Sequence, residues 1–408
     1  MAPHASDDTT TAGEVEEPRA GRRRAARYVV PVTVMGVAAA TIGLVPALAD
    51  SGDPDLPDIT AAQLIEKIAQ SDVERLSGTV RITTDLGLPN LGGLESSLAS
   101  GALGEDGEGG SSADPSGRLT ELASGTHTLR VAADGPDRQK LSLLENAAEY
   151  SLIHNGKDVW GYDSASNEVY HATVDEPDAS ERRGQRPPAT PQDFAEEALK
   201  AVDDTTSVKV DGTAQVAGRA AYRLVVEPKQ SGSTVGAVSI AVDHETGLPL
   251  KFTLTPSSGG SAVVDVGFTE VSFDRPDAST FEFTPPKGAE VTEDTEQDRE
   301  RGDFGKPERG PKSEEDLAKG FDGLKMLGEG WNTIATFDTG SDGGLPTGEA
   351  GGDLDGFLGS LGEQVEGDFG TGTVFGTRLV NALITEDGTV YVGTVTKDAL
   401  VKAADAGE

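Results

Sequence analysis

The stretches SVKVDGTAQVAGRAAYRLVVEPK (207–229), TVGAVSIAVDHETGLPLKFTLTP (234–256) and AVVDVGFTEVSFD (262–274) decide the fold of this chain. Apolar and polar residues alternate along them, the period-2 pattern of strands with one face buried and one face in water. One face collects Tyr222, Leu224, Val226, Val238, Ile240, Val242, Leu250, Phe252, Leu254, Val264, Val266 and Phe268. The opposite face receives Arg223, Ser239, Lys251 and Asp265. The pattern predicts successive antiparallel strands that form one continuous apolar wall, and the wall region runs over 208–286.

Upstream of this wall, the sequence predicts more strands of the same sheet. Residues 77–85 read as a first strand, and five short strands follow between 126 and 174. The pairs Asp134-Gly135 and Asn155-Gly156 are turn signals, because both residue types tolerate positive φ. These short strands with tight turns predict a meander.

Two amphipathic helices are expected beside the sheet. Thr60 is followed three residues later by Gln63, the spacing of a capping box. Thr190 is followed by Pro191 and Asp193, which suit the first turn of a helix. Both helices carry an apolar stripe, and the second is suited to lie in the concavity of a curved sheet.

Residues 87–117 interrupt the pattern of strands. They are rich in Gly, Ser, Asp and Glu. Loops of about 30 residues in compact domains are usually functional or disordered. This insertion is therefore either a disordered segment or a mobile lid over the mouth of a cavity.

The C-terminal third is divided by two linkers. Residues 291–312 form an acidic linker, and 340–356 form a Gly-rich linker. Between and beyond them, in 313–405, we expect a helix over 313–327, a strand over 331–338, a hairpin turning at Asp387-Gly388 and a helix over 398–404. This α+β extension has few apolar residues, so we expect it to pack against the larger body.

The N-terminus carries an export signal. Residues 1–27 are polar and predict a disordered cytoplasmic tail that ends in the basic run GRRRAAR. Residues 28–49 are uncharged and long enough to span a membrane. They are either a signal peptide cleaved after Ala49, which would release a secreted protein, or a retained anchor in the cytoplasmic membrane. Both alternatives make the remainder extracytoplasmic.

Charge and composition exclude several functions. The net charge is −36 at pH 7, which opposes binding to nucleic acid phosphates. The chain has no cysteine, and its five histidines lack the spacing of metal ligands. His154 and His171 fall in neighbouring strands, yet a surface role fits them better than a metal site. Phosphate loops, nucleophile elbows and dinucleotide fingerprints are missing. We therefore expect no enzyme, no cofactor, no metal and no nucleic acid partner.

The run GRAAYRLVVEPK, the turn VDHETGLPLKF and the segment FTEVSFDRPDASTFEFTPPKGAEV carry a family resemblance. Over residues 58–290 the chain resembles the LolA-like superfamily of lipoprotein and lipid carriers, which includes RseB/MucB-type sigma-factor regulators. It is most similar to exported, actinobacterial-type members. The resemblance implies a mainly β fold, a curved antiparallel half-barrel of about eleven strands with plug helices and a hydrophobic cavity.

The resemblance also implies a function. The expected role is a non-enzymatic envelope protein that holds a lipid or lipoprotein acyl chain in the cavity. The alternative is a regulatory module that binds an anti-sigma factor or another membrane-anchored envelope protein. The candidate cavity residues are Val80, Ile82, Leu129, Val131, Leu141, Leu143, Tyr150, Leu152, Phe194, Ala198, Leu224, Val226, Val238, Ile240, Phe252, Leu254, Val264 and Val266.

Overall fold

The computed structural model describes residues 53–87, 111–115, 118, 122, 124–173, 189–294, 324–338 and 362–407. All of them belong to the second of two compact units, Asp53–Glu408. The expected segments 1–27 and 28–49, most of the insertion and the linker 340–356 lie outside the described residues. Within the described ranges, no helix combines the length and the apolar character needed to cross a membrane.

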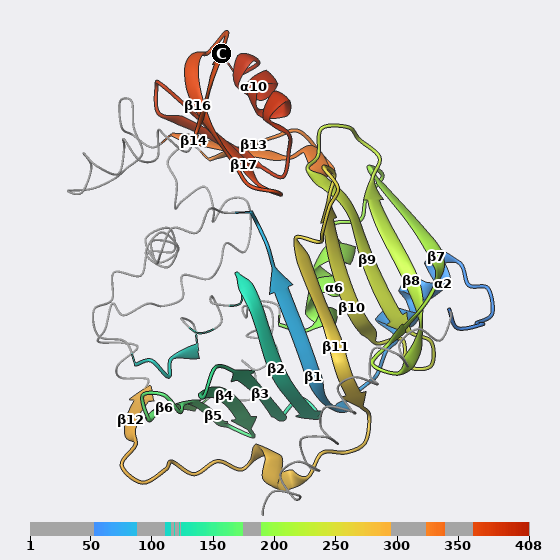
Figure 1. The fold of residues 1–408 in the computed structure, drawn as a ribbon, viewed down its shortest axis with the longest axis vertical. Helices are drawn as coiled ribbons and strands as arrows, with labels where there is room; N and C mark the ends of the chain where they lie inside the picture. Colours follow the sequence, from blue (N-terminus) through green and yellow to red (C-terminus); the bar gives the residue numbers. More distant parts are fainter. Residues whose placement is uncertain are drawn as a thin grey trace, which may run out of the picture. The chain divides into compact units, whose positions relative to one another are not determined.

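A single large curved sheet dominates the structure (Figure 1). Its strands are β1 (Arg75–Thr84), β2 (Gly125–Asp134), β3 (Arg138–Leu144), β4 (Glu149–Asn155), β5 (Asp158–Asp163), β6 (Glu168–Thr173), β7 (Thr206–Val216), β8 (Arg219–Pro228), β9 (Val235–Asp243), β10 (Pro249–Pro256), β11 (Val264–Ser272) and β12 (Glu290–Asp294). They pair in the order β12-β6-β5-β4-β3-β2-β1-β11-β10-β9-β8-β7, so the sheet ends in the edge strands β12 and β7. The mainly β, half-barrel class expected from the sequence is confirmed.

The apolar wall has the predicted register. Leu224 lies opposite Ile240, which lies opposite Phe252, which in turn lies opposite Val266. Leu224, Ile240 and Val266 are fully buried. On the other face Lys251 forms an ion pair with Asp265 at 3.0 Å. The alternation in the sequence therefore assigned both faces correctly.

The sheet has one strand more than the sequence led us to expect. Strand β12 pairs with β6 in parallel, whereas β1 to β11 pair antiparallel. The prediction of an acidic linker is thus wrong for 291–294, which form part of this strand. A short edge strand exposed on both faces needs no apolar alternation, so its sequence resembles that of a linker. Before it, the chain passes through the 3₁₀ helix η2 (Ala278–Phe281).

Both predicted plug helices are present and capped as expected. Helix α2 (Ala61–Ala69) begins after Thr60, whose hydroxyl accepts a hydrogen bond from the Gln63 N–H at 3.3 Å. Helix α6 (Pro191–Lys200) begins after Thr190, which forms a capping box with Asp193. Each box satisfies backbone donors that the first turn leaves open.

The C-terminal region forms a second sheet with the order β13-β14-β18-β17-β16-β15. Its elements are β13 (Lys325–Leu327), η3 (Gly330–Asn332), β14 (Ile334–Asp338), β15 (Glu363–Gly367), β16 (Gly370–Gly376), β17 (Asn381–Thr385), β18 (Thr389–Gly393) and α10 (Lys397–Asp405). The hairpin at Asp387-Gly388 and the final helix are confirmed. The helix predicted over 313–327 is wrong at its described end, because 325–327 pair with β14 as strand β13.

The second sheet is attached to the rim of the large sheet. The Thr234 N–H donates to the Thr394 carbonyl at 2.9 Å, and the Thr396 N–H donates to the Gly232 carbonyl at 2.7 Å. Arg378 forms an ion pair with Asp85 at 2.6 Å. The C-terminal region therefore packs against the half-barrel, as its small number of apolar residues predicts.

Candidate ligand-binding face

The eighteen candidate cavity residues lie together. Thirteen are buried members of one hydrophobic cluster: Val80, Ile82, Leu129, Val131, Leu143, Tyr150, Leu152, Leu224, Val226, Val238, Ile240, Phe252 and Val266. The other five, Leu141, Phe194, Ala198, Leu254 and Val264, are partly buried against it. Sixteen of the candidates lie on the concave face of the sheet, and Phe194 and Ala198 lie on the helix α6 (Pro191–Lys200) packed against it. That this face holds a ligand stays a prediction.

One end of the concave face is covered by α6. The helix lies across β9 and β10 (Figure 1) and also contacts β11. Phe194 packs on Phe252 with 5.3 Å between ring centroids, and Ala195 is fully buried. Ala198, Leu199 and Val202 continue the apolar stripe but remain partly exposed. Helix α6 thus closes this end with apolar contacts that are incomplete at its C-terminal half.

The other end is covered by residues from the end of the insertion. The Tyr150 hydroxyl donates to the carbonyl of Ala113 at 3.1 Å, and Ala113 is fully buried. Gly161 permits this approach, because a Cβ there would overlap the Ala113 carbonyl. Residues 111–115 therefore pack on the sheet. Most of the expected insertion, 87–117, lies outside the described residues, so the alternatives of disorder and lid remain open there.

Polar contacts fix this second cover. Ser112 donates its hydroxyl to Asp163 at 3.1 Å and its N–H to Glu168 at 2.7 Å. Arg118 forms an ion pair with Asp163, whose side chain is 3% exposed. Burial raises the pKa of Asp163, but hydrogen bonds from the Ala165 N–H, Arg118 and Ser112 outweigh it and hold the pKa below its ordinary value. Asp163 is therefore an ionised anchor for this cover.

The histidines do not form a metal site in the described part of the chain. His154 lies opposite Val159 on the concave side, whereas His171 lies opposite Trp160 on the outer side. They therefore point to opposite faces of the sheet and do not meet. In the same described residues, no group of three or more His, Cys, Asp or Glu side chains is placed to hold a metal ion.

Sequence reasoning missed a cluster on the outer face. The rings of Trp160 and His171 stack at 3.7 Å, and His171 contacts Asp158 and Glu293. Alternation along β5 and β6 could have placed Trp160 and His171 on the same face. Glu293 could not have been assigned, because the strand that carries it was read as a linker.

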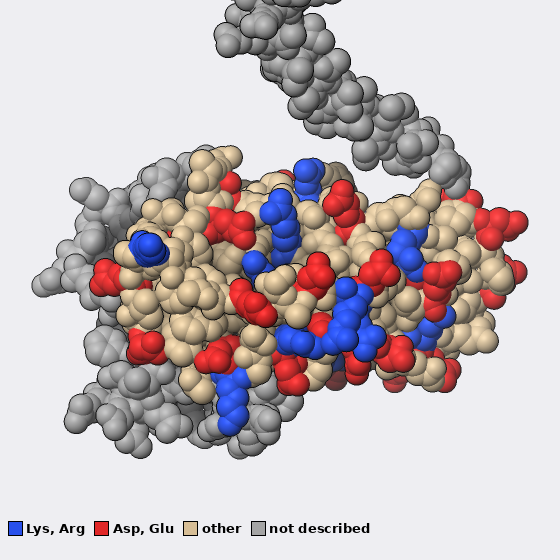
Figure 2. All heavy atoms as spheres, turned by 90° about the horizontal axis from the view of Figure 1, so that it is seen from below, with Lys and Arg blue, Asp and Glu red and all other residues tan. Residues whose placement is uncertain are grey.

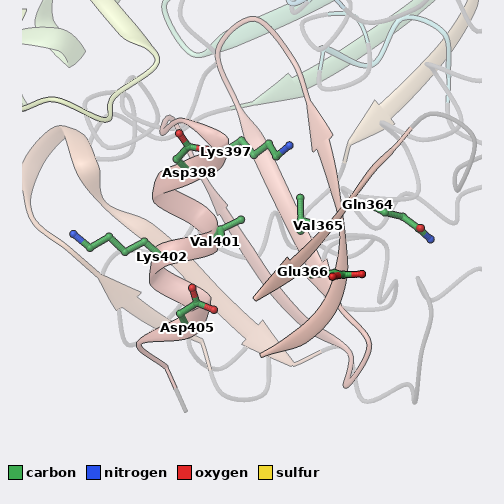
Figure 3. A pocket seen from close by; sticks show the side chains of 8 residues that line it. All are labelled: Gln364, Val365, Glu366, Lys397, Asp398, Val401, Lys402 and Asp405. Atoms are coloured by element: carbon green, nitrogen blue, oxygen red, sulfur yellow. The ribbon is translucent and has the colours of Figure 1, made fainter. Parts of the chain in front are cut away.

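Two hollows lie away from the concave core. One, of about 390 Å³, is found between the edge strand β15 and α10 (Figure 3). Its lining mixes Lys397 and Lys402 with Glu366, Asp398 and Asp405. The other, of about 470 Å³, lies on β1, β2, β3 and β11, and Val131 alone among the eighteen candidates lines it. Neither hollow is an apolar chamber suited to an acyl chain.

Charges are distributed over the surface in both signs. On the face seen in Figure 2, acidic and basic side chains are interspersed rather than gathered into a basic patch. Together with the net charge of −36, this face does not provide the positive surface that nucleic acid binding requires.

Comparison with known proteins gives structural matches only. No family model and no curated protein matches the chain. A structure of the Pseudomonas aeruginosa MucA/MucB complex matches with 14% identity and a TM-score of 0.35, covering 84% of this chain and 96% of that chain. A LolA superfamily protein from Nitrosomonas europaea matches with 10% identity and a TM-score of 0.21, covering 55% of this chain and 99% of that chain.

A third match is an uncharacterised conserved protein from Thermus thermophilus, with 12% identity and a TM-score of 0.30. It covers 57% of this chain and 99% of that chain. MucB and a LolA superfamily protein are thus among the matched structures. The expected likeness to actinobacterial members stays a prediction.

Proposed function

We propose that this chain is a non-enzymatic, extracytoplasmic binding protein that holds an acyl chain, of a lipid or a lipoprotein, between α6 and the concave face of the large sheet. The observation that carries this proposal is the incomplete apolar cover made by α6. Ala198 and Leu199 on the helix and Val202 just after it are partly exposed. Leu254 and Val264 are partly exposed on the sheet. An apolar chain that fills the seam between helix and sheet is stabilised there, because it removes these apolar surfaces from water.

The energetics favour an acyl chain over a polar ligand. Each methylene that leaves water contributes about 0.8 kcal/mol. The side chain that α6 contacts most closely on the sheet is the apolar ring of Phe252, and the helix presents Phe194 and Ala195 to it. A neutral, apolar seam suits a hydrocarbon tail, whereas a charged headgroup would remain in solvent.

The proposal is tested by native mass spectrometry of the protein purified from its own host. We expect a co-purified adduct with the mass of a lipid or an acylated peptide. After the adduct is removed with an organic solvent and the protein is refolded, incubation with oleate should restore a one-to-one complex. Absence of any adduct, together with failure to bind oleate, would overturn the proposal.

A second candidate is the binding of a membrane-anchored envelope protein, with an anti-sigma factor as one example. The second sheet favours it, because Arg378 and the Thr234–Thr394 contact join two sheets into one body that offers a larger surface. Chemical crosslinking in membranes of the host, followed by mass spectrometry, tests this candidate. A single membrane protein crosslinked to both sheets would support it. Crosslinks to lipid-processing partners only, or none, would contradict it.

A further inference from the structure

The edge strand β12 is joined to the sheet by a cluster on the outer face. His171 on β6 lies directly opposite Trp160 on β5 and Glu293 on β12. The rings of Trp160 and His171 are 3.7 Å apart and inclined by 10°, so the imidazole is stacked on the indole. Three neighbouring strands thus meet at one titratable side chain.

Both ring nitrogens of His171 face carboxylates. Nδ1 lies 2.7 Å from Glu293 Oε2, and Nε2 lies 2.9 Å from Asp158 Oδ1. A neutral imidazole carries one N–H and can donate to one carboxylate, whereas an imidazolium donates to both. In the neutral form, one carboxylate would therefore face the lone pair of a ring nitrogen. The geometry requires the protonated form for both bonds, and a cation stacked on Trp160 gains further stabilisation.

Apart from this cluster, β12 is held by its parallel backbone pairing with β6 along one edge. Its five residues are short for a strand, and Val291 is 41% exposed although it is apolar. The chain before it is anchored more firmly. Phe281 is buried, and Phe283 packs on Trp160 and Tyr162 with ring centroids 5.5 and 5.6 Å apart. Release of β12 would leave these upstream anchors undisturbed, so the strand can detach without unfolding the sheet.

We propose that β12 is a proton-controlled latch, closed on the sheet edge when the His171 side chain bridges Asp158 and Glu293 and released when that bridge is lost. Opening exposes the backbone N–H and C=O groups of β6, which are then free to pair with another extended segment. Within the described ranges, the charged groups that face His171 are Asp158 on β5 and Glu293 on β12. The segment before β12 contributes only the uncharged ring of Phe283, through Trp160.

The direction of the pH dependence follows from the surroundings of His171. Partial burial lowers the pKa of the His171 imidazole. The hydrogen bonds to Asp158 and Glu293 and the charges of these two groups outweigh burial and raise the pKa above its ordinary value of 6.5. The bridge therefore stabilises β12 fully below pH 6.5, and this contribution is lost as the pH rises through the raised pKa. The latch closes in acid and opens in base.

The first experiment follows the protonation of His171 by tryptophan fluorescence. Trp160 and Trp331 are the two tryptophans, so the difference between the parent and His171→Gln isolates Trp160. Because a stacked imidazolium quenches indole emission, we expect the parent to brighten with pH, with a midpoint above 6.5. Glu293→Gln should lower the midpoint, and His127→Gln, a distant histidine variant, should leave it unchanged. A midpoint at or below 6.5 would overturn the proposal.

The second experiment measures the latch itself by hydrogen exchange of the peptide 288–294. Comparing Glu293→Gln with the parent at the same pH removes the intrinsic pH dependence of exchange and retains the stacked histidine. At pH 5.5 we expect exchange in Glu293→Gln to be several-fold faster, because the bridge from His171 to β12 is lost. At pH 9 the two rates should be equal. Equal rates at pH 5.5, or a ratio that does not change with pH, would contradict the proposal.

Discussion

The two ends of the concave face are closed in different ways. At the β9–β11 end, α6 rests on the sheet through apolar contacts such as the Phe194–Phe252 pair. At the β4–β6 end, residues 111–115 and Arg118 are fixed by bonds from Ser112 and Arg118 to Asp163. Apolar contacts are non-directional, so another apolar group can replace them at small cost. Buried polar contacts stabilise only when each partner is satisfied, so they close the second end in a single arrangement.

The kind of contact at each end determines how easily a ligand can replace the cover there. An acyl chain that displaced the cover at the β4–β6 end would leave Asp163 buried without its partners, at considerable cost. At the α6 end it would exchange one apolar surface for another. The contrast therefore favours a site under α6, and substitutions at the two ends test this difference.

The largest effect is expected where a charge enters the shared apolar wall. Ile240→Asp places a carboxylate in the centre of the buried face, where water cannot reach it, and should cost about 4 kcal/mol or more of the free energy of unfolding. The neighbouring Ser239→Asp points to the outer face and should change stability by less than about 0.5 kcal/mol. Urea denaturation measures both. Similar losses at the two positions would disprove the assigned register.

Asp163→Ala tests the polar end. The change removes one of the two carboxylates that pair with Arg118, the other being Glu145 at 3.3 Å, and should cost about 1 to 3 kcal/mol at pH 7. The pKa of Asp163 is lowered below its ordinary value of 3.8, so its contribution is present above pH 3.8 and is lost as the pH falls through the lowered pKa. The free energies of unfolding of the parent and Asp163→Asn should therefore differ at pH 7 and converge in stronger acid. A constant difference across that range would argue against an ionised anchor.

Alanines along α6 measure how closely the apolar end is packed. Ala195 is fully buried, so Ala195→Phe should overpack the interface and cost about 1 to 3 kcal/mol. Ala201 at the end of the same helix is exposed and provides the matched control, so Ala201→Phe should change stability by less than about 0.5 kcal/mol. Thermal unfolding followed by circular dichroism compares the two. If Ala195→Phe were harmless, α6 would not rest on the wall as described.

Much of the fold could be predicted because its signals are local. Alternation over β8 to β11 assigned both faces of the wall, and the residues at Thr60 and Thr190 marked both helix starts. The contacts that close the polar end could not be predicted, since Ser112 is 51 residues from Asp163 in sequence and lies in a segment of loop-like composition. Glu293 is 122 residues from His171 and lies in a charged stretch without alternation. Residues 325–327 are too few to distinguish a strand from the end of a helix.

The central claim, an acyl chain held under α6, is tested most directly by uptake of a fluorescent fatty acid by the delipidated protein and two phenylalanine variants. Ala198 is partly exposed on the apolar stripe, so the ring in Ala198→Phe should occupy the seam without unfolding the protein. The parent and Ala201→Phe should bind the probe equally, and Ala198→Phe should bind it at least about tenfold more weakly, a loss of about 1.4 kcal/mol. No binding by the parent, or equal binding by the parent and a folded Ala198→Phe, would contradict the account.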